Sequence, residues 1–122
     1  MYNKVTMIGW LATEPELRYA PNGASVTSFR IAVSRKYVRR GEKRKSDYFN
    51  VVCWRDTAKF VCKHFSKGNL ILVEGEMQTR QYTDRNGDPA TTYEIVAERV
   101  SFTTEKNTHD EAGSDENAPY NP

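Results

Sequence analysis

Aromatic and polar side chains alternate with apolar ones along residues 47–55. Successive side chains of a strand point to opposite faces, so Tyr48 and Trp54 share one face, with Asn50 between them. The other face is uniformly apolar: Phe49, Val51 and Cys53. Stacking of a nucleobase on an aromatic ring contributes roughly 1–3 kcal/mol and tolerates any base. The pattern therefore predicts a stacking platform for a single-stranded nucleic acid. The alternative is that both rings cover the second side of a buried strand.

Cations accompany aromatic residues in four separate segments of the chain. The aromatic residues are Tyr37, Tyr48, Trp54 and Tyr82. The cations beside three of them are Lys36, Arg55 and Arg80, and Tyr48 follows the basic segment 39–45. If neighbouring strands place these positions in one groove, stacking rings and phosphate-pairing cations alternate along it.

No residue pattern indicates catalysis. The set Cys53, Cys62 and His64 lacks the fourth ligand and the paired spacing of a zinc site. Asp84 and Asp88 flank a turn, and we expect them to stabilise this turn and not to bind a metal ion. Phosphate-binding glycine loops, nucleophile elbows and carboxylate motifs are missing from the sequence. We therefore expect a binding protein with no catalytic residue, no metal and no cofactor.

Charge divides the 122-residue chain into a basic body and an acidic tail. Residues 1–103 hold 17 Lys and Arg against 11 Asp and Glu, a net charge of +6, whereas residues 104–122 hold 1 against 5, a net charge of −4. The length and the 38% apolar content predict one folded domain over residues 1–103. The polar residues 104–122 predict a disordered acidic tail. Two cysteines, no signal peptide and no long apolar run predict a cytoplasmic protein with reduced thiols.

Hydrophobic periodicity predicts five strands and one helix. The strands are expected at residues 5–11, 25–37, 48–54, 70–82 and 92–102. Between the third and fourth strands, Ala58, Val61, Cys62 and Phe65 form one helical stripe over residues 56–65, with Asp56 as the expected N-cap. Asn86-Gly87 predicts a hairpin between the last two strands. This order is typical of an OB-fold, an all-β five-stranded Greek-key barrel, and the alternative is another small barrel of SH3 type.

The sequence resembles the bacterial single-stranded DNA-binding proteins over about residues 3–102. The shared motifs are Asn3-Lys4-Val5, Gly9-Trp10-Leu11, Pro15-Glu16-Leu17-Arg18-Tyr19, Pro21-Asn22-Gly23, Phe49-Asn50-Val51-Val52, Lys67-Gly68, Glu74-Gly75 and Thr79-Arg80. The resemblance implies an OB-fold, a homotetramer, and sequence-independent wrapping of single-stranded DNA in replication, repair and recombination. In cells, it implies association with the nucleoid.

Family positions also assign roles to individual residues. The stacking positions of the family match Tyr37, Tyr48, Trp54 and Tyr82, the residues chosen above. Its basic contacts match Lys4, Arg18, Lys67 and Arg80, and we expect further phosphate contacts from Lys36, Arg39, Arg40, Lys43, Arg44 and Arg55. Trp10 stands where the family more usually has a polar or basic residue. Its ring is either a fifth stacking ring or a packing residue, and we expect it to contact DNA. Asn50 and Gln78 are neutral where some members carry cations.

The end of the sequence differs from the family pattern. Members usually finish in an acidic run, an aliphatic residue, proline and a terminal phenylalanine that docks partner enzymes. Here the acids are scattered and the last residues are Asn117-Ala118-Pro119-Tyr120-Asn121-Pro122. This argues against recruitment of replication and repair proteins through the tail. From the residues alone, a protein-interaction OB module and an RNA-binding OB module stay open as alternatives.

Overall fold

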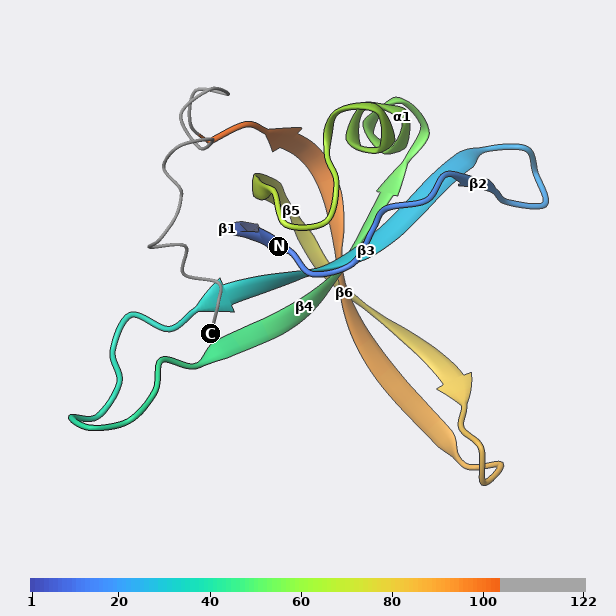
Figure 1. The fold of residues 1–122 in the computed structure, drawn as a ribbon. Helices are drawn as coiled ribbons and strands as arrows, with labels where there is room; N and C mark the ends of the chain where they lie inside the picture. Colours follow the sequence, from blue (N-terminus) through green and yellow to red (C-terminus); the bar gives the residue numbers. More distant parts are fainter. Residues whose placement is uncertain (104–122) are drawn as a thin grey trace.

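The computed structural model describes residues 1–103, which form a strongly twisted β-structure with one helix (Figure 1). Its elements, in chain order, are β1 Val5–Leu11, β2 Arg18–Tyr19, β3 Ser25–Ser34, β4 Ser46–Trp54, α1 Arg55–His64, β5 Leu70–Thr83 and β6 Pro89–Ser101. The strands are hydrogen-bonded in the order β1-β5-β6-β4-β3-β2, and β1 also pairs with β3. The pairing of β1 with β3 closes five strands into a ring. Every pair is antiparallel except β4 with β6. The predicted OB-fold is confirmed.

β2 was not predicted from the sequence. It is a two-residue strand, in which Arg18 pairs with Val26 and Tyr19 with Ser25. Two residues are too few for a hydrophobic period, so pattern alone could not find it. The strand pairs with the start of β3, on the edge opposite β4, whereas β1 pairs with β3 farther along at Ile31 and Ala32.

The interior of the barrel is filled by the inward-pointing residues of all five ring strands. Ile31, Val51, Ile71, Val73 and Ile95 are fully buried, and they belong to β3, β4, β5 and β6, with Leu11 contributed by β1. Burying a side chain of this size stabilises a fold by roughly 1.5–3 kcal/mol. The apolar face predicted for β4 matches this core, since Val51 and Cys53 are fully buried and Phe49 packs against the cluster.

Helix α1 packs against β3, β4 and β6. Ala58, Val61 and Phe65 are buried and Cys62 is half-buried, as the helical stripe predicted. The expected N-cap was wrong: Trp54 occupies that position without a side-chain cap, and Asp56 lies inside the first turn. There its carboxylate still complements the positive end of the helix dipole. Because β4 runs directly into α1, Arg55 takes the turn with a φ of +54°.

The loop between β3 and β4 and the hairpin formed by the ends of β5 and β6 project from the barrel (Figure 1). β3 ends at Ser34, so Tyr37 falls in the loop to β4 and not in the predicted strand. The β5–β6 hairpin turns at Asn86-Gly87 as predicted, with Gly87 at a φ of +85°. Asp84 serves this turn, because its side chain accepts hydrogen bonds from the N–H groups of Asn86 and Asp88, each at 2.9 Å. The predicted tail, residues 104–122, lies outside the described residues.

Gly75 allows β5 and β6 to approach closely at an irregularity in their pairing. The register shifts between Glu74 and Gly75. A Cβ atom at Gly75 would lie 2.1 Å from the carbonyl oxygen of Val96 and 2.9 Å from Cα of Ala97. Both neighbours are backbone atoms, so they cannot rotate away as a side chain does.

We therefore predict that Gly75→Ala lowers the free energy of unfolding by about 1–3 kcal/mol or more, the typical cost of overpacking. Denaturant unfolding followed by circular dichroism measures it. Thr79→Ala is the control, because Thr79 is exposed on the same strand and its replacement should cost less than about 1 kcal/mol. Equal losses for the two variants would contradict the steric argument.

Candidate nucleic-acid interface

The outward-pointing residues of β3, β4, β6 and β5 form one continuous surface, which we call the outer face. The register establishes it: Arg30 pairs with Asn50, Asn50 with Glu94, and Glu94 with Gln78. Alternate residues along each strand share that side. The outer face therefore carries Ser28, Arg30, Tyr48, Asn50, Val52, Trp54, Thr92, Glu94, Gln78, Arg80 and Tyr82.

The stacking candidates on the strands are accessible. The exposed fractions are 48% for Tyr48, 42% for Trp54 and 47% for Tyr82. Neither Tyr48 nor Trp54 therefore covers a buried second side of β4, the alternative that the sequence left open. Trp10 is half-buried on β1 opposite Ala32, which in turn pairs with Tyr48. That register places Trp10 on the same side of the sheet as Tyr48, across β3 from it.

Arg30 is a candidate contact that the sequence argument missed. Its guanidinium carbon lies 4.8 Å from the centre of the Tyr48 ring, a cation–π contact. The backbone N–H of Arg30 donates to the Thr13 hydroxyl at 3.0 Å, which ties the strand to the preceding loop. The signal was present, because Arg30 alternates with the core residues Phe29 and Ile31. Arg30 and Tyr48 are far apart in sequence and meet only because β3 pairs with β4.

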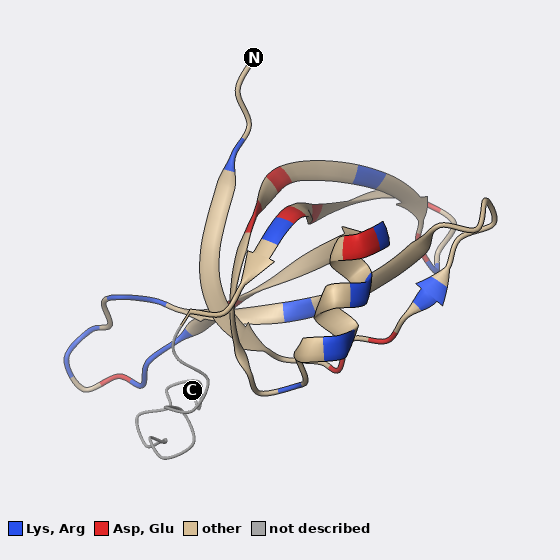
Figure 2. Cartoon of the chain, turned by 90° about the horizontal axis from the view of Figure 1, so that it is seen from above, with Lys and Arg blue, Asp and Glu red and all other residues tan. Residues whose placement is uncertain are grey.

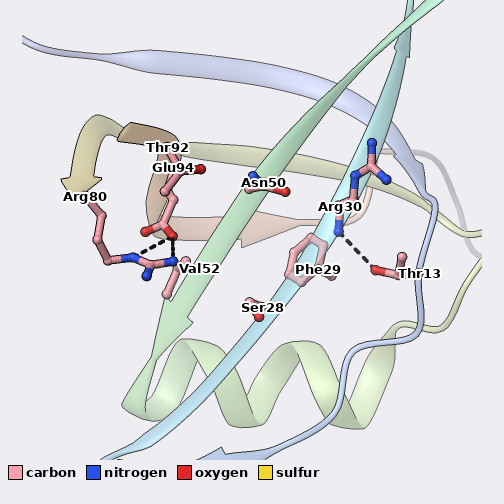
Figure 3. Close-up of a pocket in the computed structure, with 9 residues that line it drawn as sticks. All are labelled: Thr13, Ser28, Phe29, Arg30, Asn50, Val52, Arg80, Thr92 and Glu94. Carbon is pink, nitrogen blue, oxygen red and sulfur yellow. Dashed lines mark hydrogen bonds and ion pairs between the residues drawn. The ribbon is translucent and has the colours of Figure 1, made fainter. Parts of the chain in front are cut away.

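A shallow pocket of about 360 Å³ lies in the middle of the outer face (Figure 3). Arg80 and Glu94 form an ion pair at its edge, with Nη2 of Arg80 2.6 Å and Nε 3.1 Å from Oε2 of Glu94. The Glu94 carboxylate raises the pKa of Arg80 through these hydrogen bonds. The lining residues are Thr13, Ser28, Phe29, Arg30, Asn50, Val52, Arg80, Thr92 and Glu94.

The loop between β3 and β4, residues 35–45, is the most basic exposed segment of the described chain (Figure 2). We call it the basic loop. Tyr37 on it is 85% exposed. The predicted phosphate contacts on it are all exposed: Lys36, Arg39, Arg40, Lys43 and Arg44.

The base of the basic loop is held by Arg35 and Asp47. Nε and Nη2 of Arg35 each donate to Asp47 at 2.9 Å, and the N–H of Arg35 donates to the Lys45 carbonyl at 2.8 Å. The hydrogen bond from Arg35 lowers the pKa of Asp47 below its ordinary value of 3.8. The pair is therefore intact at neutral pH and is lost only when acid protonates the carboxylate.

The remaining predicted cations do not all join the outer face. Arg18 on β2 does extend it, since its Nη2 donates to the Ser28 hydroxyl at 3.1 Å. Arg55 is exposed at the start of α1, directly after Trp54. Lys4 precedes β1 near its pairing with Gly75, and Lys67 precedes β5 near the other end of that strand pair. These two lysines are exposed, but neither lies on any of the four strands of the outer face.

The family comparison agrees with this geometry. The model of the single-strand binding protein family matches residues 2–103, the whole described domain apart from Met1. The chain belongs to this family. Single-stranded DNA-binding protein A of Bacillus subtilis strain 168 is 41% identical over 107 residues, which cover 88% of this chain and 62% of that protein. The chain thus spans less than two thirds of the length of that relative.

Two further relatives of this family member are also named single-stranded DNA-binding proteins. Single-stranded DNA-binding protein 2 of Listeria monocytogenes is 38% identical over 117 residues, covering 96% of this chain and 73% of that protein. Single-stranded DNA-binding protein 2 of Staphylococcus aureus strain Mu50 is 38% identical over 107 residues, covering 88% and 76%. None of these names refers to a catalytic activity.

The structure of residues 1–103 also bears on thiol chemistry and metal binding in this family member. Burial raises the pKa of the Cys53 thiol to about 12, which leaves it unreactive at neutral pH. Within these residues, no three or more His, Cys, Asp or Glu side chains are grouped to hold a metal ion. The same part of the chain has no helix long and apolar enough to span a membrane.

Proposed function

We propose that this chain binds single-stranded DNA independently of sequence and protects it during replication, recombination and repair. The observation that carries the proposal is the joint exposure of Tyr48 and Trp54 on β4, with Arg30 on the neighbouring strand β3 and Arg80 on β5 of the same outer face. Aromatic rings beside cations on one barrel face suit a polymer of stackable bases joined by phosphates. The names of the relatives point to the same ligand.

In this proposal the bases stack on the exposed rings and the phosphates pair with cations around them. The stacking residues are Tyr37, Tyr48, Trp54, Tyr82 and Trp10. Phosphate contacts come from Lys4, Arg18, Lys36, Arg39, Arg40, Lys43, Arg44, Arg55, Lys67 and Arg80. Residues 1–103 act as the DNA-binding domain, and the protein works in the cytoplasm, on the nucleoid. Arg80 contributes less charge than its type suggests, because Glu94 neutralises part of it.

Stacking is tested by titrating the protein with oligo(dT) and following tryptophan fluorescence. We expect saturable quenching by the single strand, little by duplex, and a loss of about 1–3 kcal/mol of binding free energy in Trp54→Ala. Since Trp54→Ala removes a fluorophore, anisotropy of labelled DNA measures its affinity. The control is Tyr93→Ala: Tyr93 is 62% exposed on β6 but points away from the outer face, as its strand neighbours Thr92 and Glu94 line the pocket. If Trp54→Ala lost less than a few tenths of a kcal/mol of binding free energy, Trp54 would not stack on the DNA.

The contribution of the basic loop is tested by the salt dependence of binding. Each phosphate contact on a single strand contributes about 0.7 to the slope of log K against log salt concentration. Arg39→Gln with Arg40→Gln should therefore lower the slope by up to about 1.4. The matched control replaces Lys59 and Lys63, which are exposed on α1. Equal slopes in the wild type and the loop variant would show that the DNA does not reach this loop.

We propose further that the chain assembles as a homotetramer, in line with its family. The outward side of β1 offers an apolar contact, since Ile8 is 50% exposed there. Sedimentation equilibrium should give four times the chain mass of 14.0 kDa. Ile8→Glu should shift the protein to smaller species, because a charge at an apolar contact is costly to desolvate. A wild-type protein that stays monomeric at micromolar concentration would refute the assembly.

A further inference from the structure

The arginines near the stacking residues differ in whether an acid offsets their charge. Arg80 donates to Glu94 at 2.6 and 3.1 Å, and Arg35 at the base of the basic loop donates twice to Asp47. Arg30 has no such acid: within residues 1–103 its guanidinium makes no hydrogen bond and no ion pair. The hydrogen bond drawn at Arg30 in Figure 3 comes from its backbone nitrogen. The full charge of Arg30 is therefore available to a ligand.

Arg30 covers one face of the Tyr48 ring. Its guanidinium carbon lies over the ring, 4.8 Å from the ring centre. Tyr48 is nevertheless 48% exposed, which agrees with one face covered by the cation and the opposite face open to solvent. A nucleobase needs only one ring face to stack. The covered face holds the ring, and the open face remains for a base.

We propose that Arg30 and Tyr48 act as one unit that holds a single nucleotide. The base stacks on the open face of the Tyr48 ring, and the guanidinium of Arg30 pairs with the phosphate beside that base. The inference rests on the proposed function. It adds Arg30 to the phosphate contacts, and it makes Arg30 a positioning residue for the Tyr48 ring.

One guanidinium can make both contacts at once. The cation–π contact depends on its charge lying over the ring, whereas its five N–H donors lie in its own plane and point away from its centre. Arg30 can therefore stay on the ring while its N–H groups donate to two oxygens of a phosphate. A ring that is already held in place loses little conformational freedom when a base stacks on it.

Two simpler roles for Arg30 predict different results. If a base displaced the guanidinium from the ring, the two would compete, and removing Arg30 would tighten binding. If Arg30 only held the ring, its removal would weaken binding without changing the dependence on salt, because no phosphate contact would be lost. The proposed unit predicts weaker binding together with a smaller salt dependence.

The experiment measures the dissociation constant of labelled oligo(dT) by anisotropy at several salt concentrations. We expect Arg30→Gln to weaken binding and to lower the slope of log K against log salt concentration by about 0.7, one phosphate contact on a single strand. Lys59→Gln is the matched control, since it removes the same charge from an exposed position on α1 and should leave the slope unchanged. Circular dichroism checks that Arg30→Gln folds, as expected for an exposed side chain.

A double-mutant cycle tests whether the two residues act together. Tyr48→Leu removes the ring and keeps an apolar side chain. The variant with both changes should bind about two- to fivefold more tightly than the product of the two single losses predicts, the size expected for an exposed cation–π contact. Residues that contribute independently would give losses that multiply.

Three results would each overturn the inference: a slope for Arg30→Gln equal to that of Lys59→Gln, tighter binding by Arg30→Gln, or single losses that multiply in the double variant. Each of these leaves binding by the wild type intact. Failure of the wild type to bind oligo(dT) would instead refute the proposed function.

Discussion

The pairing of β1 with β3 is the constraint on which the rest of this structure depends. It comprises two register pairs, Trp10 with Ala32 and Leu11 with Ile31, and it closes five strands into a ring. Gly9 makes the closure sterically possible, because a Cβ atom there would lie 2.7 Å from the Ala32 carbonyl oxygen. A closed ring has one inside and one outside, so each strand must direct its alternate residues to the core or to solvent. Closure thereby determines which side chains are available to a ligand.

The candidate interface is a consequence of this division. In β4, Val51 and Cys53 belong to the core, so Tyr48, Asn50 and Trp54 must point outward. Paired strands hold their side chains in a fixed register. The protein therefore loses little conformational entropy when a ligand binds to this face. Contacts across strands then arise without adjacency in sequence. Arg30 meets Tyr48 in this way, and Arg80 meets Glu94.

Much of this arrangement could be predicted from the sequence because it depends on periodicity. The alternation in residues 47–55 predicted which aromatic residues are exposed, and the stripe from Ala58 to Phe65 predicted the buried side of α1. The start of the helix could not be predicted by the capping rule, since β4 continues into α1 without a loop and Trp54 takes the N-cap position. The pocket was also missed. Its residues come from four strands and the Thr13 loop, and only the three-dimensional register brings Asn50 beside Glu94.

The two parts of the interface differ in how they can contribute to binding. On the outer face, ring positions are set by strand pairing, and Glu94 offsets the charge of Arg80, so stacking and hydrogen bonding weigh more than charge there. On the basic loop, the cations are exposed and paired with few acids, so their effect is electrostatic and screened by salt. High salt should therefore weaken the loop contacts before the stacking contacts. In the proposed function, the basic loop would therefore contact the phosphates of a single strand and the outer face its bases.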